Sequence, residues 1–171
     1  MVEDLGREFP RVRKFATLSP VPGFRRWLAE SVNTNGGLPP DVKKDSKLAR
    51  IVATLEKADW LEDKALRTEL QADLVPLCAY YLLHAKHGKE PMDSVARFHL
   101  RNGARLERID WLGDISPTGM RRSAGLMTNY VYRLADVERN HELYTREYKI
   151  TASREIEVLA KRSLMISAVK S

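Results

Sequence analysis

Residues 17–24 restrict the local fold more than any other part of this sequence, because two prolines and a glycine follow Ser19 in quick succession. Pro20 and Pro22 fix φ near −65° and remove two backbone donors. Gly23 allows backbone conformations that other residues avoid. A Ser-Pro pair alone is typical of an ordinary turn. A hydroxyl held just before such a rigid turn is nevertheless oriented more reliably than one on a mobile loop, so Ser19 is a candidate functional residue.

A second informative segment covers residues 94–104 and can be interpreted in two ways. Asn102 and Gly103 fit the turn of a β-hairpin or the left-handed end of a helix. We favour the helix, because Asp93 or Ser94 can cap its start and Gly103 can end it. Three side chains then share one face at i, i+3 and i+4, namely Val95, Phe98 and His99.

Apolar periodicity and breaker residues predict the other elements. Strands are expected over residues 12–18, 104–112 and 123–134. Helices are expected over residues 3–8, 24–32, 45–55 and 153–166, and over about 66–82 with a kink at Pro76. Residues 33–40 are the clearest loop. The single cysteine, Cys78, lies in an apolar helical stretch and is expected to be a buried hydrophobic residue.

Several blocks of sequence together resemble the catalytic half of the malonyl-CoA decarboxylase family. These blocks occupy residues 7–10, 17–24, 76–80, 95–104, 109–116 and 123–132. They follow the order of the family and cover most of the chain, with gaps mainly at 32–60 and 136–150. Several long blocks in order are far more specific than a single short motif.

The resemblance implies an α+β fold, the C-terminal half of a GNAT-like acyltransferase fold with a helical insertion and an incomplete sheet. It implies one partial catalytic domain over residues 1–171. Residues 1–23 form a helix end, a strand and the Ser19 turn, residues 24–92 the helical segment, and residues 93–171 the catalytic helix, strands and terminal helix. The family's N-terminal helical domain, first strands and pyrophosphate loop have no counterpart here, so a truncated form, inactive by itself, is expected.

The resemblance also implies a carboxy-lyase of fatty acid metabolism that converts malonyl-CoA to acetyl-CoA and CO2. The thioester carbonyl accepts the electron pair as an enolate, so we expect no metal and no cofactor. By resemblance, His99 is the proton donor, four residues before Gly103 as in the general-acid Tyr of GNAT enzymes, and Ser19 is the proton acceptor. The residues themselves favour a second role for Ser19. Because the malonyl carboxylate is already ionised, its hydroxyl would bond that carboxylate or the enolate oxygen.

Tyr132 matches a family tyrosine that lines the active site, and it is our third candidate for substrate binding. Alternation along a strand places Tyr130 on the same face, and core packing is the alternative for both. His84 and His87 have the i, i+3 spacing of metal ligands on a helix, but no further ligand is evident. His141 is expected in a polar loop. Asp110, Asp114 and Ser116 suggest a carboxylate pair, but capping of strand ends explains them as well.

The net charge of +6 does not predict nucleic-acid binding, because basic and acidic residues are interspersed and no recognition motif accompanies them. An excess of positive charge suits a ligand with several phosphates, such as coenzyme A. No membrane contact is expected, since no apolar run approaches ~20 residues. We expect a homo-oligomer in full-length form and a bacterial-type cytoplasmic location, with a mitochondrial one open; the C-terminus lacks the peroxisomal Ser-Lys-Leu signal. The alternatives are an acyltransferase of the same fold and an inactive fragment that acts only in protein–protein contact.

Overall fold

The structure is a computed structural model, which describes residues 4, 7–33 and 46–166. Its main sheet is antiparallel and has the order β1-β5-β4. The strands of this sheet are β1 (Lys14–Pro20), β4 (Arg105–Asp110) and β5 (Met127–Arg133). A small hairpin pairs β2 (Lys86–His87) with β3 (Glu90–Pro91).

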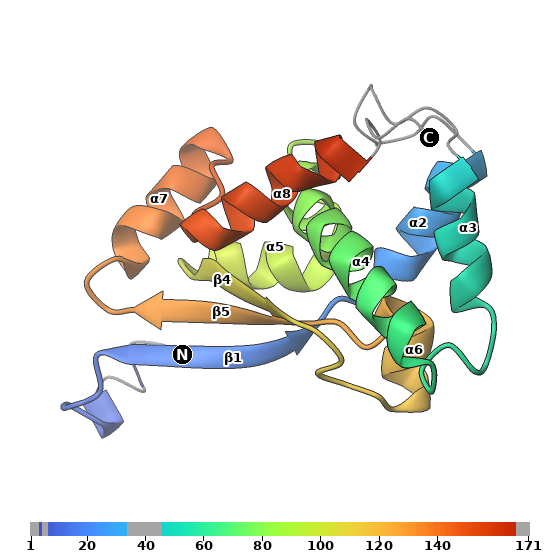
Figure 1. The fold of residues 1–171 in the computed structure, drawn as a ribbon. Coiled ribbons are helices and arrows are strands. Elements are labelled where there is room, and N and C mark those ends of the chain that lie inside the picture. The colour runs from blue at the N-terminus through green and yellow to red at the C-terminus, as the bar shows by residue number, and fades with distance from the viewer. Residues whose placement is uncertain (1–3, 5–6, 34–45, 167–171) are drawn as a thin grey trace.

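Seven labelled helices accompany this sheet in the described part of the chain. They are α2 (Phe24–Asn33), α3 (Ser46–Leu55), α4 (Lys64–His84), α5 (Ser94–Arg101), α6 (Pro117–Ser123), α7 (Val137–Glu147) and α8 (Arg154–Ile166). Helices α4, α5, α7 and α8 lie on one side of the sheet, whereas α2, α3 and α6 gather beyond the end of β1 (Figure 1). Among the described helices, none is both long and apolar enough to cross a lipid bilayer.

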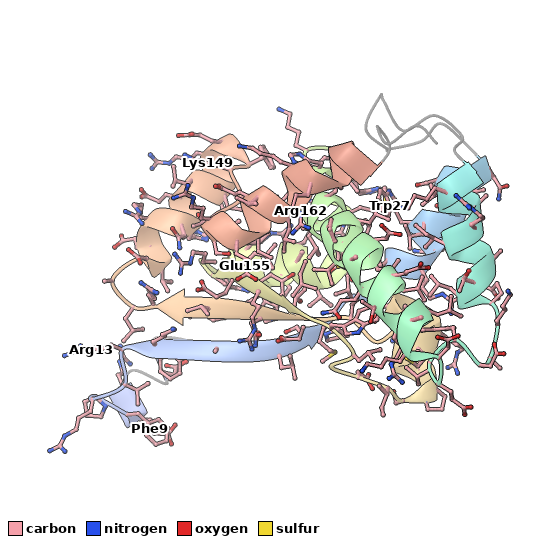
Figure 2. All side chains as sticks on the ribbon, viewed as in Figure 1. Phe9, Arg13, Trp27, Lys149, Glu155 and Arg162 are labelled. Carbon is pink, nitrogen blue, oxygen red and sulfur yellow. The ribbon has the colours of Figure 1, made fainter. Side chains whose placement is uncertain are left out.

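The core lies between the sheet and the long helix α4, whose apolar side chains are buried along most of its length. Leu74, Leu82 and Tyr81 of α4 are almost completely inaccessible, as are Leu106 of β4 and Ile156 of α8. Burial of such side chains is the main source of stability in a domain of this kind. Charged side chains such as Lys149, Glu155 and Arg162 are instead exposed and point away from this core (Figure 2).

Most of the expected elements are present, and the α+β class is confirmed. The expected strand over residues 12–18 is β1, which begins two residues later and continues through Pro20. Proline is tolerated there because β1 is an edge strand of the described sheet. The helices expected from residues 24, 45 and 153 are α2, α3 and α8, and residues 4, 7 and 8 are helical. Residues 34–40 of the expected loop lie outside the described residues.

Two expectations about the second half of the chain are wrong. The strand over 123–134 begins only at Met127, because residues 117–123 form α6, with Ser116 as its N-cap and Pro117 in its first turn. Helix α7 occupies part of the expected polar loop. It escapes a periodicity test because only Asn140 and Tyr144 of its residues are buried.

Candidate active site

Strand β1 places Ser19 at the sheet end nearest to α2. We expected Ser19 in a turn, but it lies within the strand. The turn follows at residues 22–23. The backbone of Ser19 pairs with Thr128 of β5, and the Thr128 hydroxyl donates to the Ser19 carbonyl over 3.3 Å. Only 5% of the Ser19 surface is exposed. Strand register therefore fixes this hydroxyl.

Helix α5 carries His99 in its last turn. The Asp93 carboxylate accepts from the Ala96 amide over 2.8 Å and caps the helix start, as predicted. Gly103 ends the helix with φ +88°, a conformation that favours glycine. His99 is buried, but Phe98 is 51% exposed, so the predicted common face of these two side chains is wrong. The buried side chains of α5 are Ala96, His99 and Leu100.

The structure brings the three predicted site residues together in one hydrogen-bonded row. Ser19 Oγ lies 3.0 Å from His99 Nε2, and Tyr132 Oη lies 2.6 Å from His99 Nδ1. Thr17 Oγ1 extends the row, at 3.1 Å from Ser19 Oγ. Sequence reasoning missed Thr17, although alternation along β1 puts it on the same face as Ser19.

Tyr130 completes the surroundings of the imidazole. Its ring stacks on that of His99, with centroids 4.4 Å apart and an interplanar angle of 19°. The predicted common face of Tyr130 and Tyr132 is confirmed, because both are buried and both contact His99. The imidazole is thus held by two hydrogen bonds and by one aromatic face, which leaves it little rotational freedom.

Burial shifts the acid–base properties of this cluster. Removal of water lowers the pKa of His99 below its usual 6.5, because burial penalises the charged imidazolium. The same cause raises the pKa of Tyr132 to about 12, so its phenol stays protonated at neutral pH. The resting His99 is therefore neutral, with one ring nitrogen as donor and the other as acceptor.

The other sequence candidates lie away from this cluster or have structural roles. His84 ends α4, while His87 is in β2, so the expected helical i, i+3 pair does not exist. His141 lies in α7 and donates from Nδ1 to the Arg101 carbonyl over 2.6 Å, which corrects its placement in a loop. No group of three or more metal-ligating side chains occurs among the described residues.

The polar residues that follow β4 have local structural roles. Asp110 pairs with Arg108 over 2.9 Å at the end of the strand. The Asp114 carboxylate accepts from the Ser116 amide, and the Ser116 hydroxyl accepts from the Gly119 amide at the start of α6. Ser116 thus caps a helix and not a strand end. Cys78 is fully buried in α4, as expected, and burial raises the pKa of its thiol.

Comparison with known proteins identifies one family for nearly the whole chain. A model described as the malonyl-CoA decarboxylase C-terminal domain matches residues 1–169. The mitochondrial malonyl-CoA decarboxylase of Anser anser anser is 34% identical over an alignment 170 residues long. The aligned region covers 91% of this chain and 34% of that protein. The Mus musculus protein of the same name is 36% identical, with 91% and 35% covered. The chain thus spans about a third of the length of these curated relatives.

Two bacterial crystal structures agree with this assignment. Malonyl-CoA decarboxylase from Rhodopseudomonas palustris superposes with a TM-score of 0.81 and 42% identity, covering 92% of this chain and 36% of that one. The enzyme from Agrobacterium vitis gives a TM-score of 0.79 at 42% identity, with 92% and 38% covered. By its sequence and by its fold, this chain belongs to the malonyl-CoA decarboxylase family, in the part that forms the C-terminal domain.

Proposed function

We propose that this chain carries the proton-transfer site of a malonyl-CoA decarboxylase, with His99, Ser19 and Tyr132 as its working residues. The observation that supports this most is the 3.0 Å bond between Ser19 Oγ and His99 Nε2, which joins two residues far apart in sequence inside a buried cluster. A buried histidine bonded to a hydroxyl on one side and a phenol on the other is suited to moving a proton.

The protein must contribute three things to catalysis of this reaction. Loss of CO2 from a malonyl thioester leaves an electron pair on the adjacent carbon, and the thioester carbonyl accepts it as an enolate. The site must orient the carboxylate out of the carbonyl plane, stabilise the developing oxyanion and deliver one proton to carbon. One proton is consumed for each CO2 released. The enolate itself needs no metal or organic group.

His99 delivers the proton in this proposal. Its lowered pKa makes the imidazolium a stronger acid than a solvent-exposed one. The neutral ring must take up a proton again before each turnover. Tyr132 serves both states of the ring, since its hydroxyl donates to Nδ1 of the neutral imidazole and accepts from Nδ1–H of the imidazolium. The ring orientation is therefore kept through the cycle.

Ser19 holds the reacting group in place. Its hydroxyl accepts from His99 Nε2–H and donates to the malonyl carboxylate or to the enolate oxygen. Its position at the proton-donating nitrogen puts the substrate carbon next to that nitrogen. This role needs only a positioned hydrogen bond, because the malonyl carboxylate is ionised before it binds.

The test is to place residues 1–171 in the context of a full-length protein of the family, to incubate that protein with malonyl-CoA alone in deuterated water, and to measure CO2 and labelled acetyl-CoA. Equal amounts of both products, with deuterium in the acetyl methyl group and with neither product formed by His99→Ala, would support the proposal. Consumption of the thioester only after an amine or thiol acceptor is added would instead identify an acyltransferase of the same fold. Two bacterial structures, at 42% identity, are more similar to this chain than the mitochondrial relatives at 34% and 36%, which supports a bacterial-type enzyme of the cytoplasm, whereas a third bacterial structure is 32% identical.

A further inference from the structure

A polar cavity lies at the end of α5 opposite to His99. It has a volume of about 540 Å³, and its walls include four arginines from three helices. We define the arginine pocket by these residues, which are Arg26 of α2, Arg97 of α5, and Arg121 and Arg122 of α6. Tyr81 of α4 also lines it, close to Gly23, where an added Cβ would lie 2.6 Å from the Tyr81 oxygen.

These four guanidinium groups have no carboxylate partner within the described ranges. Arg97 donates to the Pro91 carbonyl over 3.3 Å and Arg121 to the Thr118 hydroxyl over 3.2 Å, which leaves most of their donors unused. The one acid on the described walls is Asp93, which is buried and caps α5 through Ala96. Gathering like charges in one cavity is unfavourable unless an anion neutralises them.

Arg25 shows that a basic residue beside this pocket need not face a ligand. It donates to the carbonyls of Met120 and Leu55 and pairs with Glu56, so it joins α2 to α6 and to the end of α3. Its neighbour Arg26 makes none of these bonds and lines the pocket. Arg25 thereby brings the arginines of α6 next to Arg26 of α2.

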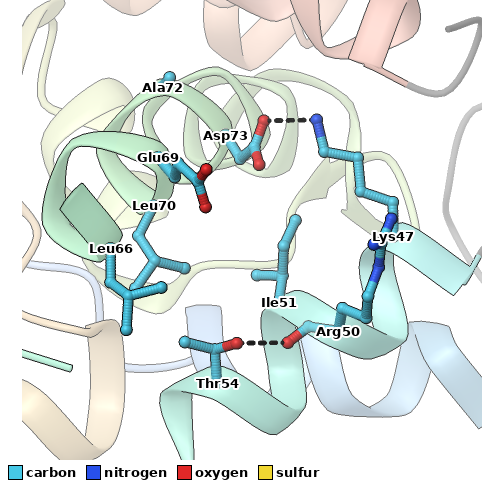
Figure 3. A pocket seen from close by; sticks show the side chains of 9 residues that line it. All are labelled: Lys47, Arg50, Ile51, Thr54, Leu66, Glu69, Leu70, Ala72 and Asp73. Atoms are coloured by element: carbon cyan, nitrogen blue, oxygen red, sulfur yellow. Dashed lines mark hydrogen bonds and ion pairs between the residues drawn. The ribbon is translucent and has the colours of Figure 1, made fainter. Parts of the chain in front are cut away.

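The cavity between α3 and α4 is a useful contrast, because its charges compensate one another. It has a volume of about 430 Å³, and Lys47 pairs there with Asp73 over 2.9 Å (Figure 3). Glu69 and Arg50 add one charge of each sign to the same walls. Such a cavity has no preference for an anion. The arginine pocket has four basic residues and one acid on its walls, so its charges do not balance. A further cavity at the start of β1 and the end of β5 also has more basic residues than acids, with Arg13, Lys14 and Arg133 beside Asp136, but it lies away from α5.

We propose that the arginine pocket binds the phosphate groups at the nucleotide end of the acyl-CoA thioester, an inference that rests on the function proposed above. Guanidinium groups bind phosphate oxygens through paired, charge-assisted hydrogen bonds. Two structural links connect the pocket to the reacting end. Pro22 and Gly23 on its wall are three and four residues after Ser19 in the chain, and Ser94 on its wall is on the same helix as His99. At 1.5 Å per residue, Ser94 and His99 are about 8 Å apart along α5.

A phosphate anchor at this distance would serve catalysis as well as affinity. The flexible arm between the phosphates and the thioester of coenzyme A is long enough to pass from the pocket to the buried imidazole. Binding energy gained at the distant phosphates restricts the thioester to the neighbourhood of Ser19 and His99. The arginine pocket thus holds the phosphates of the acyl-CoA, while the site at His99 converts its thioester end.

The experiment is titration calorimetry of the 171-residue chain with three probes, namely coenzyme A, dephospho-coenzyme A and pantetheine. The pocket variant is Arg121→Gln/Arg122→Gln, with Arg97→Gln as a second, independent variant. The matched control, Arg139→Gln/Arg146→Gln, removes two exposed arginines of α7 and changes the net charge equally. We expect the pocket variant to weaken coenzyme A binding by about tenfold or more, since one charged hydrogen bond is worth about 1.5–3 kcal/mol. Pantetheine binding and the control should change by less than about twofold.

The outcomes separate this inference from the proposed function. Loss of affinity for coenzyme A alone assigns the 3′-phosphate to the pocket, which agrees with a pyrophosphate held by the family's own loop. Loss for dephospho-coenzyme A as well shows that the pocket contacts the pyrophosphate too. Wild-type chain that binds coenzyme A no better than pantetheine, or pocket variants that bind it like wild type, would overturn the inference. Turnover of malonyl-CoA with an unchanged KM in the pocket variants would leave the function standing while rejecting the pocket. Pocket-dependent binding without decarboxylation would do the reverse.

Discussion

The two ends of helix α5 differ in almost every physical property. At its last turn, His99 is buried, neutral and hydrogen-bonded on both ring nitrogens. At its first turn, the arginine pocket is open, strongly positive and short of partners among the described residues. Proton transfer gains from a dry site with fixed groups, whereas capture of a multiply charged ligand gains from unpaired cations. One short helix therefore separates chemistry from binding, and variants at its two ends should affect different kinetic constants.

Replacement of His99 by alanine should give the largest effect and should fall on turnover alone. In the full-length context, we expect kcat for malonyl-CoA decarboxylation to fall by a factor on the order of 10² to 10⁴, the usual scale of general acid catalysis. Coenzyme A affinity should stay within about twofold, because no charge of the arginine pocket changes. Steady-state CO2 release and calorimetry measure the two quantities. Near-normal turnover would remove His99 from the mechanism.

Ser19→Ala should have a smaller effect on the same constant. The hydroxyl is lost while the pairing of β1 with β5 is kept, so the fold should survive. We expect kcat to fall on the order of 10¹- to 10³-fold, as is typical when one positioned donor to a developing oxyanion is removed. A rise in KM with unchanged kcat would show that Ser19 binds substrate and transition state equally well. Thr17→Ala is the matched control one bond further along the row.

The family resemblance singled out the residues of this cluster, while local signals in the sequence predicted only the elements that carry them. A capping aspartate and a terminal glycine predicted the helix of His99, and strand alternation placed Tyr130 on the same face as Tyr132. The contact between Ser19 and His99 joins residues 80 positions apart, and no local pattern specifies such a distance. The arginine pocket could not be foreseen, because Arg121 and Arg122 belong to α6, a helix too short to show periodicity.

Tyr132→Phe should give a moderate change, with a spectroscopic signature that simple loss of packing would not produce. Removing the phenol takes a hydrogen-bond partner from Nδ1 in both states of the ring, and the loss is larger for the imidazolium, whose hydrogen bond is charge-assisted. The pKa of His99 should therefore fall further, and kcat should fall by about tenfold, the equivalent of about 1.4 kcal/mol. NMR titration of the His99 ring protons measures the pKa. An unchanged or higher pKa would show that Tyr132 does not accept from Nδ1–H of the imidazolium.

The smallest expected effect concerns the pH dependence of stability. The pKa of buried His99 is lowered in the folded state, so between that value and 6.5 the unfolded chain binds more protons than the native one. Stability should therefore decrease as pH falls below about 6.5, and His84, whose pKa is also lowered, adds to this trend. Urea unfolding at pH 7.5 and pH 5.5 should show a smaller loss for His99→Gln than for wild type. Equal losses would mean that His99 titrates alike in both states. Arg121→Gln, at the other end of α5, should retain the wild-type slope.

The pairing of β1 with β5 has a consequence for how this lineage tolerates changes in length. Ser19 of β1 is aligned by its register with Thr128 of β5, and β5 also carries Tyr130 and Tyr132. A one-residue insertion in either strand would turn every later side chain to the opposite face and separate the hydroxyl from the imidazole. Insertions between elements leave this alignment intact. Natural length variation should therefore spare residues 14–20 and 127–133 and accumulate in the connections.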